Sequence, residues 1–199
     1  CLFAVCLSLS WILVMDDAIA GATADHKKFE VLQQDFKSGP EVTRACLSCH
    51  TEAARQVMKT QHWKWESLNP NTGRKVGKKA LVNNFCIGIA GNYADCTSCH
   101  IGYGWKDRNF DFTAEENVDC LVCHDQTGTY TKSPAGAGMP AEGTDLLMIA
   151  QNVGISSRAN CGTCHFYGGG GENIKHGDLD QGLVNPAEEY DVHMGRGML

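Results

Sequence analysis

The sequence predicts a mainly α fold with low regular secondary structure, and three observations indicate it. Residues 51–65 place Ala54, Met58 and His62 on one stripe, with the i, i+4, i+8 spacing of a single helix. No segment alternates apolar and polar residues as a half-buried strand does. The chain also has 22 glycines among 199 residues, and only 8% of its residues are aromatic. This composition favours a loop-rich chain.

Two more helices are predicted from capping signals. The segment Thr113-Ala-Glu-Glu116 matches a capping box and predicts a helix that leads to Cys120. Thr144 is expected to cap a helix over residues 145–153, which Gly154 would end.

The connecting segments have the composition of turns and loops. Residues 69–79 are a turn-rich, basic connection. Residues 133–143 and 168–171 are predicted loops because glycine and other small residues dominate them.

One five-residue motif, Cys-x-x-Cys-His, occurs four times. The copies are Cys46–His50, Cys96–His100, Cys120–His124 and Cys161–His165. This spacing is the attachment signature of c-type haem, in which two thiols bond to the macrocycle and the adjoining imidazole binds its iron. A short helical turn puts residues i, i+3 and i+4 on one face, so all three side chains meet one porphyrin.

Zinc is the main alternative, because cysteine and histidine are also its ligands. A zinc site, however, does not require a histidine directly after the second cysteine four times over. Structural disulfides and a thioredoxin-type redox pair fit the repeated motif less well. Haem is therefore the favoured interpretation.

Four covalently attached haem c groups are predicted, with the four motif histidines as proximal iron ligands. Porphyrins would replace much of the side-chain core that a domain of this size needs. We therefore expect a multihaem cytochrome c fold organised around closely packed haems. The predicted cofactor-binding residues are Cys46, Cys49, His50, Cys96, Cys99, His100, Cys120, Cys123, His124, Cys161, Cys164 and His165.

Residues 1–24 have the pattern of a signal peptide that is clipped at its N-terminus. An apolar run over residues 2–15 is followed by small residues that suit signal peptidase. The run is short for a membrane span, so no stable membrane insertion is expected after cleavage. Residues 25–199 are interpreted as one tetrahaem cytochrome c region. Export and haem attachment both indicate the periplasm.

The charge of the chain limits its partners. Its net charge is −6, and it is −4 without the leader, which holds Asp16 and Asp17 and no basic residue. This balance argues against nucleic acid or an anionic membrane as a partner. Small molecules and redox proteins remain as the expected partners.

Four histidines lie outside the motifs, and each is a candidate second ligand for an iron. They are His26, His62, His176 and His193. A lone surface histidine is usually only solvated, but electron-transfer haems commonly carry two strong axial ligands. In an unbroken helix, His62 would lie about 18 Å from His50. We therefore expect His62 to serve a neighbouring haem and not the first.

Several stretches resemble the octahaem tetrathionate reductase family. They are residues 45–54, 83–86, 96–105, 117–124 and 161–178. The similarity covers nearly the whole chain after the leader, but only the first half of the family's length. Family members carry eight haems, so the resemblance implies that residues 25–199 are part of a larger octahaem domain.

The resemblance also implies a catalytic pocket at the second haem. In the family this haem has a lysine as the axial ligand opposite the motif, and the matching residue here is Lys175. An asparagine and a cysteine of the pocket match Asn83 and Cys86, and the acidic pocket residue matches Glu172, where the family has aspartate. Cys86 is also the one cysteine outside the motifs and the leader. Without the resemblance, Lys175 would be taken for a solvated lysine and Cys86 for a small buried apolar residue.

The implied function is that of a periplasmic multihaem reductase. Its substrates would be tetrathionate, cleaved by two electrons to two thiosulfates, and also nitrite and hydroxylamine. A redox protein would donate the electrons. The alternative is a tetrahaem electron carrier with no substrate site, which differs in having every iron closed by two strong ligands. A haem-based gas sensor is a third class, but the sequence shows no output domain.

Overall fold

Short helices joined by long loops make up the chain. The computed structural model describes residues 24–82, 88–166 and 177–198. The α-helices of these segments are α1 (Gly39–Leu47), α2 (Ala53–Val57), α3 (Gln61–Lys64), α4 (Tyr93–Cys96), α5 (Leu121–His124), α6 (Leu146–Gln151), α7 (Arg158–His165) and α8 (Val192–Gly195). Single 3₁₀ turns lie at His26–Lys28, Glu30–Leu32, Lys78–Ala80, Ile89–Gly91, Thr97–Cys99, Glu115–Asn117 and Gln181–Val184. Even α1 has only nine residues, so packing and not intrinsic propensity must hold these helices.

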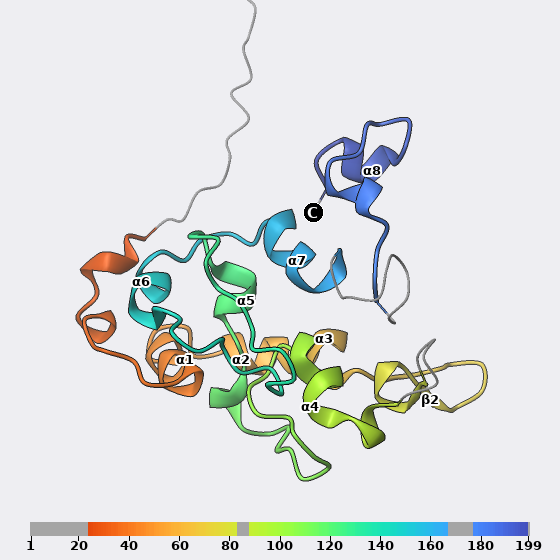
Figure 1. Cartoon of the computed structure of the whole chain (residues 1–199), viewed down its shortest axis with the longest axis horizontal. Helices are drawn as coiled ribbons and strands as arrows, with labels where there is room; N and C mark the ends of the chain where they lie inside the picture. The colour runs from red at the N-terminus through yellow and green to blue at the C-terminus, as the bar shows by residue number, and fades with distance from the viewer. Residues whose placement is uncertain (1–23, 83–87, 167–176, 199) are drawn as a thin grey trace, which may run out of the picture.

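The sheet content of the described residues is one small hairpin. Strands β1 (Ser67–Leu68) and β2 (Lys75–Val76) pair antiparallel, with Ser67 opposite Val76 and Leu68 opposite Lys75. All four residues are exposed. The hairpin lies at one end of the molecule, beyond α4 in Figure 1. The prediction of a mainly α fold with low regular content is therefore confirmed.

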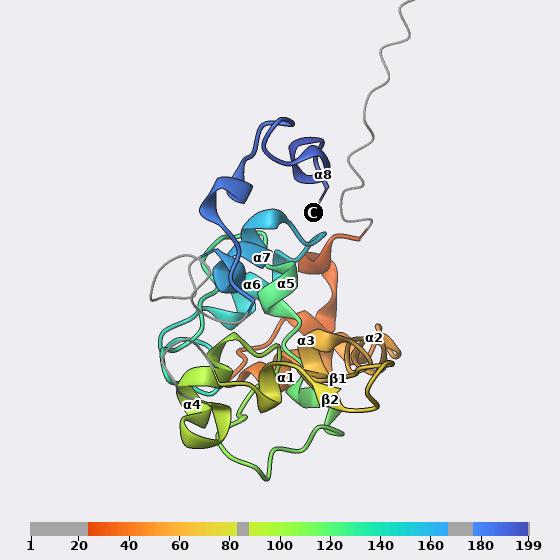
Figure 2. The ribbon, with the colours of Figure 1, turned by 90° about the vertical axis from the view of Figure 1, so that its right-hand side faces the viewer.

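The main core is built where α1, α5 and α6 meet. Val42 of α1, Leu121 of α5 and Ile149 of α6 are each 0% exposed and belong to one apolar cluster. A smaller cluster consists of Trp65, Ile89 and Trp105, with Tyr93 and Cys96 of α4 packed against it. Figure 1 and Figure 2 both place α5, α6 and α7 close together. The motif-bearing helices α5 and α7 are in direct contact.

The segment after α7 is tied back to it by one arginine. Arg158 of α7 donates to the carbonyl oxygens of Val184, Met194 and Met198, at 3.3, 2.8 and 2.6 Å. These bonds hold α8 near the start of α7. No helix among the described residues is long and apolar enough to cross a membrane.

The predicted single helix over residues 51–65 is wrong. It is two short helices, α2 and α3, because Thr60 takes an extended backbone with ψ 165° and its hydroxyl donates to the Val57 carbonyl at 2.7 Å. Such local side-chain bonds compete with helix continuation. The chain then ends α3 at Trp65, whose φ of 52° is left-handed. The distance of about 18 Å that a continuous helix would give therefore does not apply.

The two predicted N-caps are displaced. Asp111 accepts from the backbone and hydroxyl of Thr113, and only a single 3₁₀ turn follows, so the predicted capping box does not form. The cap of α6 is Asp145, which accepts from the Met148 backbone at 2.8 Å. Thr144 instead donates its hydroxyl to the Ala141 carbonyl at 2.6 Å. The helix ends at Gln151 and so is shorter than predicted.

Candidate haem centres

Each motif lies on or directly beside a short helix. Cys46 belongs to the last turn of α1, and Cys96 ends α4, which continues into the 3₁₀ turn Thr97–Cys99. The third motif forms α5, with Cys120 at its N-cap, and the fourth forms the second half of α7. This arrangement puts the two cysteines and the histidine of each motif within about one helical turn.

The imidazoles of the third and fourth motifs are oriented by backbone carbonyls. Nδ1 of His124 lies 2.8 Å from the Gly154 oxygen, and Nδ1 of His165 lies 2.6 Å from the Gly177 oxygen. A carbonyl can only accept, so each Nδ1 carries the proton. In the neutral tautomer that this bond favours, Nε2 is the unprotonated nitrogen, which is the form that binds a metal. These two histidines fit the role of proximal ligands.

Two pairs of imidazoles have the spacing of axial ligands on one iron. The ring centroids of His26 and His50 are 6.4 Å apart, and those of His62 and His165 are 6.0 Å apart. With metal–nitrogen bonds of about 2 Å on either side, and ring centres about 1 Å further out, two axial imidazoles need about 6 Å. Both pairs meet that requirement, and each joins one motif histidine to one of the spare histidines.

The surroundings of His26 and His62 fit a role as metal ligands. The atoms packed around His62, and then the neighbouring His165, lower the pKa of His62. Nδ1 of His26 is buried and has no hydrogen-bond partner among the described residues. Such orphaned atoms are rare in folded proteins, and here the atom fits a ligand to a bound metal.

The second motif places its imidazole differently. His100 is 0% exposed, and its Nε2 donates to the Trp63 carbonyl at 2.7 Å. Its Nδ1 is buried with no partner in the described segments. Burial is the main cause that lowers the pKa of His100 to about 3, so the ring is neutral. Binding iron through Nε2 would require the bond to Trp63 to break.

An aromatic cluster surrounds His100. Its ring centroid lies between 4.8 and 6.1 Å from those of five aromatic side chains. They are Trp63, Trp65, Trp105, Phe110 and Phe112. No other motif histidine has such a shell among the described residues.

The four motifs are packed against one another. The thiols of Cys46 and Cys120 share a hydrogen bond, which lowers the pKa of Cys46 and raises that of Cys120. A second such bond joins Cys99 to Cys164 and raises the pKa of Cys164. Burial raises the pKa of Cys123 to about 11, and Cys161 is one of the nearby groups that add to this. The first motif therefore adjoins the third, the third adjoins the fourth, and the fourth adjoins the second.

A buried ion pair connects the second and third motifs. The Asp119 side chain is 0% exposed and accepts from the hydroxyls of Tyr103 and Tyr130, at 2.9 and 2.8 Å. It also accepts from Lys132, at 3.1 Å, and from the backbone of Val122 in α5, at 3.1 Å. Lys132 donates in addition to the His100 carbonyl. Burial first, and then the charge of Asp119, raise the pKa of both tyrosines, which therefore stay protonated donors.

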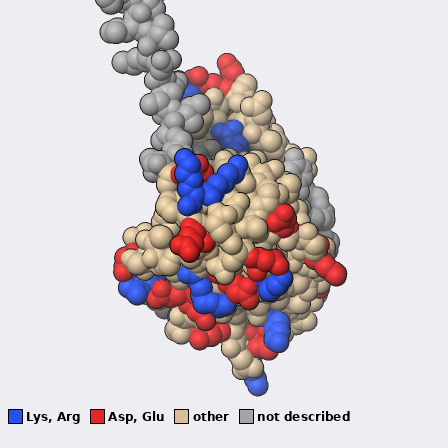
Figure 3. Space-filling model, turned by 90° about the vertical axis from the view of Figure 1, so that its left-hand side faces the viewer, with Lys and Arg blue, Asp and Glu red and all other residues tan. Residues whose placement is uncertain are grey.

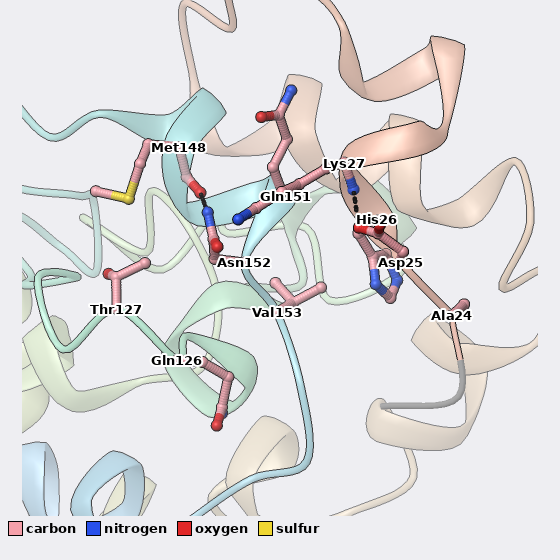
Figure 4. A pocket seen from close by; sticks show the side chains of 10 residues that line it. All are labelled: Ala24, Asp25, His26, Lys27, Gln126, Thr127, Met148, Gln151, Asn152 and Val153. Carbon is pink, nitrogen blue, oxygen red and sulfur yellow. Dashed lines mark hydrogen bonds between the residues drawn. The ribbon is translucent and has the colours of Figure 1, made fainter. Parts of the chain in front are cut away.

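A cavity of about 480 Å³ adjoins His26. It is lined by residues of the turn His26–Lys28, of α6 and of the loop after α5, which Figure 4 labels. The cavity is in the size range of small-molecule sites. It is not at the second motif, where the resemblance places the substrate.

The predicted catalytic residues Asn83, Cys86, Glu172 and Lys175, and the candidate ligand His176, lie outside the described residues. His193 lies on α8 with an exposed side chain, and its ring contacts no other ring in the described segments. It is therefore not brought to any motif. All eight motif cysteines are described, and none of them forms a disulfide. In the same segments no three His, Cys, Asp or Glu side chains gather as a zinc site would require.

Sequence reasoning missed several residues that shape these centres. Asp119, Lys132 and Trp65 carry no local signal, because their partners are distant in the chain. Lys78 and Lys79 were visible only as part of the basic connection over residues 69–79.

The four motifs, on a mainly α fold with little regular secondary structure, define the class of the protein. It is that of the multihaem c-type cytochromes. A family model described as cytochrome c554 and c-prime matches residues 45–125, which include the first three motifs. A crystal structure of the octahaem cytochrome c from Shewanella oneidensis has 52% sequence identity and a TM-score of 0.75. The alignment covers 88% of this chain and 39% of that one.

The chain is therefore a multihaem c-type cytochrome related to the octahaem cytochrome, and it spans about two fifths of that protein's length. The predicted resemblance and fold class are confirmed. A further match, 25% identical over 226 residues, is an uncharacterized protein of Archaeoglobus fulgidus, with 87% of this chain and 75% of that protein covered.

Proposed function

We propose that this chain is part of a periplasmic multihaem reductase that reduces tetrathionate to two thiosulfates, with nitrite and hydroxylamine as further substrates. The observation that carries the proposal is the contrast between the motif histidines. His50 and His165 each face a second imidazole at about the axial-ligand distance, whereas His100 and His124 do not among the described residues. Of the latter two, only His100 is enclosed by aromatic rings. Similarity to an octahaem cytochrome c supports the redox class.

The chain offers attachment sites for four haem c groups, through the twelve motif residues. Bound haem c supplies one-electron transfer and, where its iron keeps a displaceable ligand, a site for substrate. His26 would close the first iron opposite His50, and His62 the fourth opposite His165. Contact between the motifs supports closely spaced centres, which electron transfer needs.

Lys175 is proposed as the ligand that gives way at the second motif. A lysine must lose its proton to bind iron, and holding it neutral at pH 7 costs about 4.6 kcal/mol from a reference pKa near 10.4. Its bond is therefore conditional, unlike that of an imidazole. If displaced, the Lys175 ammonium group would be a cation suited to an anionic substrate. Asn83, Cys86 and Glu172 complete the proposed pocket, with Cys86 available for sulfur chemistry and Glu172 for proton transfer.

The periplasm and the partners belong to the same proposal. The leader pattern in residues 1–24 supports export. The acidic balance of the chain supports small molecules and a redox donor protein over nucleic acid. Figure 3 shows acidic and basic side chains interspersed over one face, without a single large patch of one sign.

The test uses the full-length, haem-loaded protein. Proteolysis followed by mass spectrometry should show four haem groups on this region, attached at the four cysteine pairs. Lys175→Ala should abolish or strongly lower turnover of tetrathionate while the other haems stay low-spin. His176→Ala and the double variant are the controls, because the adjacent imidazole could replace the lost amine. Unchanged turnover and an unchanged spectrum in Lys175→Ala and in the double variant would favour the electron-carrier alternative.

A further inference from the structure

The aromatic rings that contact His100 also contact a short lysine-bearing turn. Trp65, Trp105 and Phe112 form this aromatic wall, with ring centroids 5.2, 4.8 and 6.1 Å from that of His100. Trp65 and Trp105 are 9% and 2% exposed. The wall is therefore dense, and the ammonium groups of the turn Lys78–Ala80 lie over two of its rings.

Two residues with positive φ angles, Trp65 and Gly77, bring that turn against the wall. Trp65 has a left-handed backbone, with φ 52° and ψ 18°, which is rare for a bulky residue and marks a conformation held by its surroundings. Its carbonyl accepts from the backbone N–H of Lys79 at 3.1 Å. Gly77 has φ 139°, and a Cβ there would lie 2.4 Å from the Trp65 oxygen, so only glycine allows this approach.

This arrangement places two ammonium groups over the faces of aromatic rings. Nζ of Lys78 lies 4.5 Å from the centre of the Trp65 ring, and Nζ of Lys79 lies 4.3 Å from the centre of the Phe112 ring. Aromatic faces attract a cation but do not neutralise it. Neither lysine forms an ion pair within the described residues. The nearby Glu66 pairs with Lys75 at 2.9 Å, and the charge of Lys79 also contributes to the lowered pKa of Glu66.

We propose that Lys78 and Lys79 form an anion-binding site at the edge of the second haem-attachment motif, which takes small inorganic dianions. The site rests on the proposed function for its physiological ligand, which would be tetrathionate. Both ammonium groups lie over rings of one wall, so the fields of the two positive charges add at its surface, and the apolar rings beneath them strengthen the attraction for an anion. On a chain with net charge −6, such a site raises the local concentration of an anion where the bulk of the protein repels it.

The test measures binding without turnover. The full-length ferric protein, with no electron donor, is titrated by calorimetry with sulfate and then with tetrathionate. Lys78→Gln and Lys79→Gln should each raise the dissociation constant of sulfate about three- to fivefold, and the double variant about tenfold. Lys78→Arg should keep binding close to the wild type because the charge remains. Higher ionic strength should weaken the wild type more than the double variant.

Lys59→Gln is the matched control. Lys59 is exposed and lies in the turn between α2 and α3, and its replacement removes one charge away from the wall. It should change the dissociation constant by less than about twofold. Equal weakening in Lys59→Gln and Lys78→Gln, unchanged binding in the double variant, or no sulfate binding by the wild type would each overturn the proposal.

The same titrations separate this inference from the proposed function. If sulfate binding depends on Lys78 and Lys79 but the protein does not reduce tetrathionate, the anion site is supported and the proposed substrate is wrong. Reduction of tetrathionate with no dependence on Lys78 and Lys79 would keep the substrate and refute the anion site.

Discussion

The second and fourth motifs have the same pattern of cysteines and histidine, yet the structure gives their imidazoles opposite settings. His165 has its Nδ1 bound to the Gly177 carbonyl and faces His62. His100 has its Nε2 bound to the Trp63 carbonyl and is enclosed by aromatic rings. The motif thus identifies where a haem is attached, but the surrounding residues decide what its iron can do.

Removing the second imidazole from the fourth centre is expected to have the largest effect. His62→Ala should turn one low-spin haem high-spin, because the ring at 6.0 Å from His165 is the proposed sixth ligand. Magnetic circular dichroism or electron paramagnetic resonance of the ferric protein measures this. His193→Ala is the control and should leave the spectrum unchanged. A fully low-spin spectrum in His62→Ala would return this residue to the class of solvated histidines.

Breaking the ion pair beside the second motif should have the next largest effect. Asp119→Ala leaves Lys132 as a buried, unpaired charge and should lower the free energy of unfolding by about 3–5 kcal/mol. Denaturant titration followed by circular dichroism measures it. Asp111→Ala, at an exposed turn, should lower the free energy of unfolding much less. Similar losses in the two variants would show that the Asp119 network adds little.

The shape of the turn against the aromatic wall can be tested at one glycine. Gly77→Ala forces a side chain into a left-handed position and against the Trp65 oxygen, and should cost about 1–3 kcal/mol. Gly73→Ala is a matched control, since Gly73 has φ 65° but no neighbouring atom within 4 Å of where a Cβ would lie. It should cost less than Gly77→Ala in the same denaturant titration. The reverse order would contradict the packing of this turn.

The effect of removing a single hydrogen bond beside the wall should be similar to that of Gly77→Ala or smaller. The Trp63 indole donates to the Phe112 carbonyl at 3.1 Å, and Trp63→Phe leaves that carbonyl without this donor. The loss of unfolding free energy should be about 1–3 kcal/mol, at the lower end if water reaches the oxygen. The bond from His100 to the Trp63 backbone should survive. A shift in the second haem's spectrum would show that the indole itself orients His100.

The sequence predicted the parts of this molecule that depend on local spacing. The four motifs, their helical turns and the low regular content all follow from neighbouring residues. The break between α2 and α3 was not predictable from periodicity, because it depends on the Thr60 hydroxyl and on burial of Trp63. The displaced caps have the same origin, since Asp145 and Thr144 both offer an oxygen and only packing selects one.

The candidate sites show the same difference between features set by local spacing and features set by distant contacts. His62 was expected to serve a haem other than the first, and its ring does lie next to His165, although the continuous helix behind that expectation is absent. His26 lies beside His50, and Asp119 binds Tyr103 from 16 residues further along the chain, but no repeat or period links either pair. The pocket of Asn83, Cys86, Glu172 and Lys175 stays a prediction from resemblance.

Cyanide binding to the full-length ferric protein tests the central claim most directly. The account predicts that cyanide binds the haem attached at Cys96 and Cys99, because Lys175 is displaceable, and leaves the centres of His50 and His165 closed by two imidazoles. Low-temperature magnetic circular dichroism, with Lys175→Ala for assignment, identifies the haem that changes. Cyanide binding to the centre of His50 or His165, or to no haem in this region, would contradict the account.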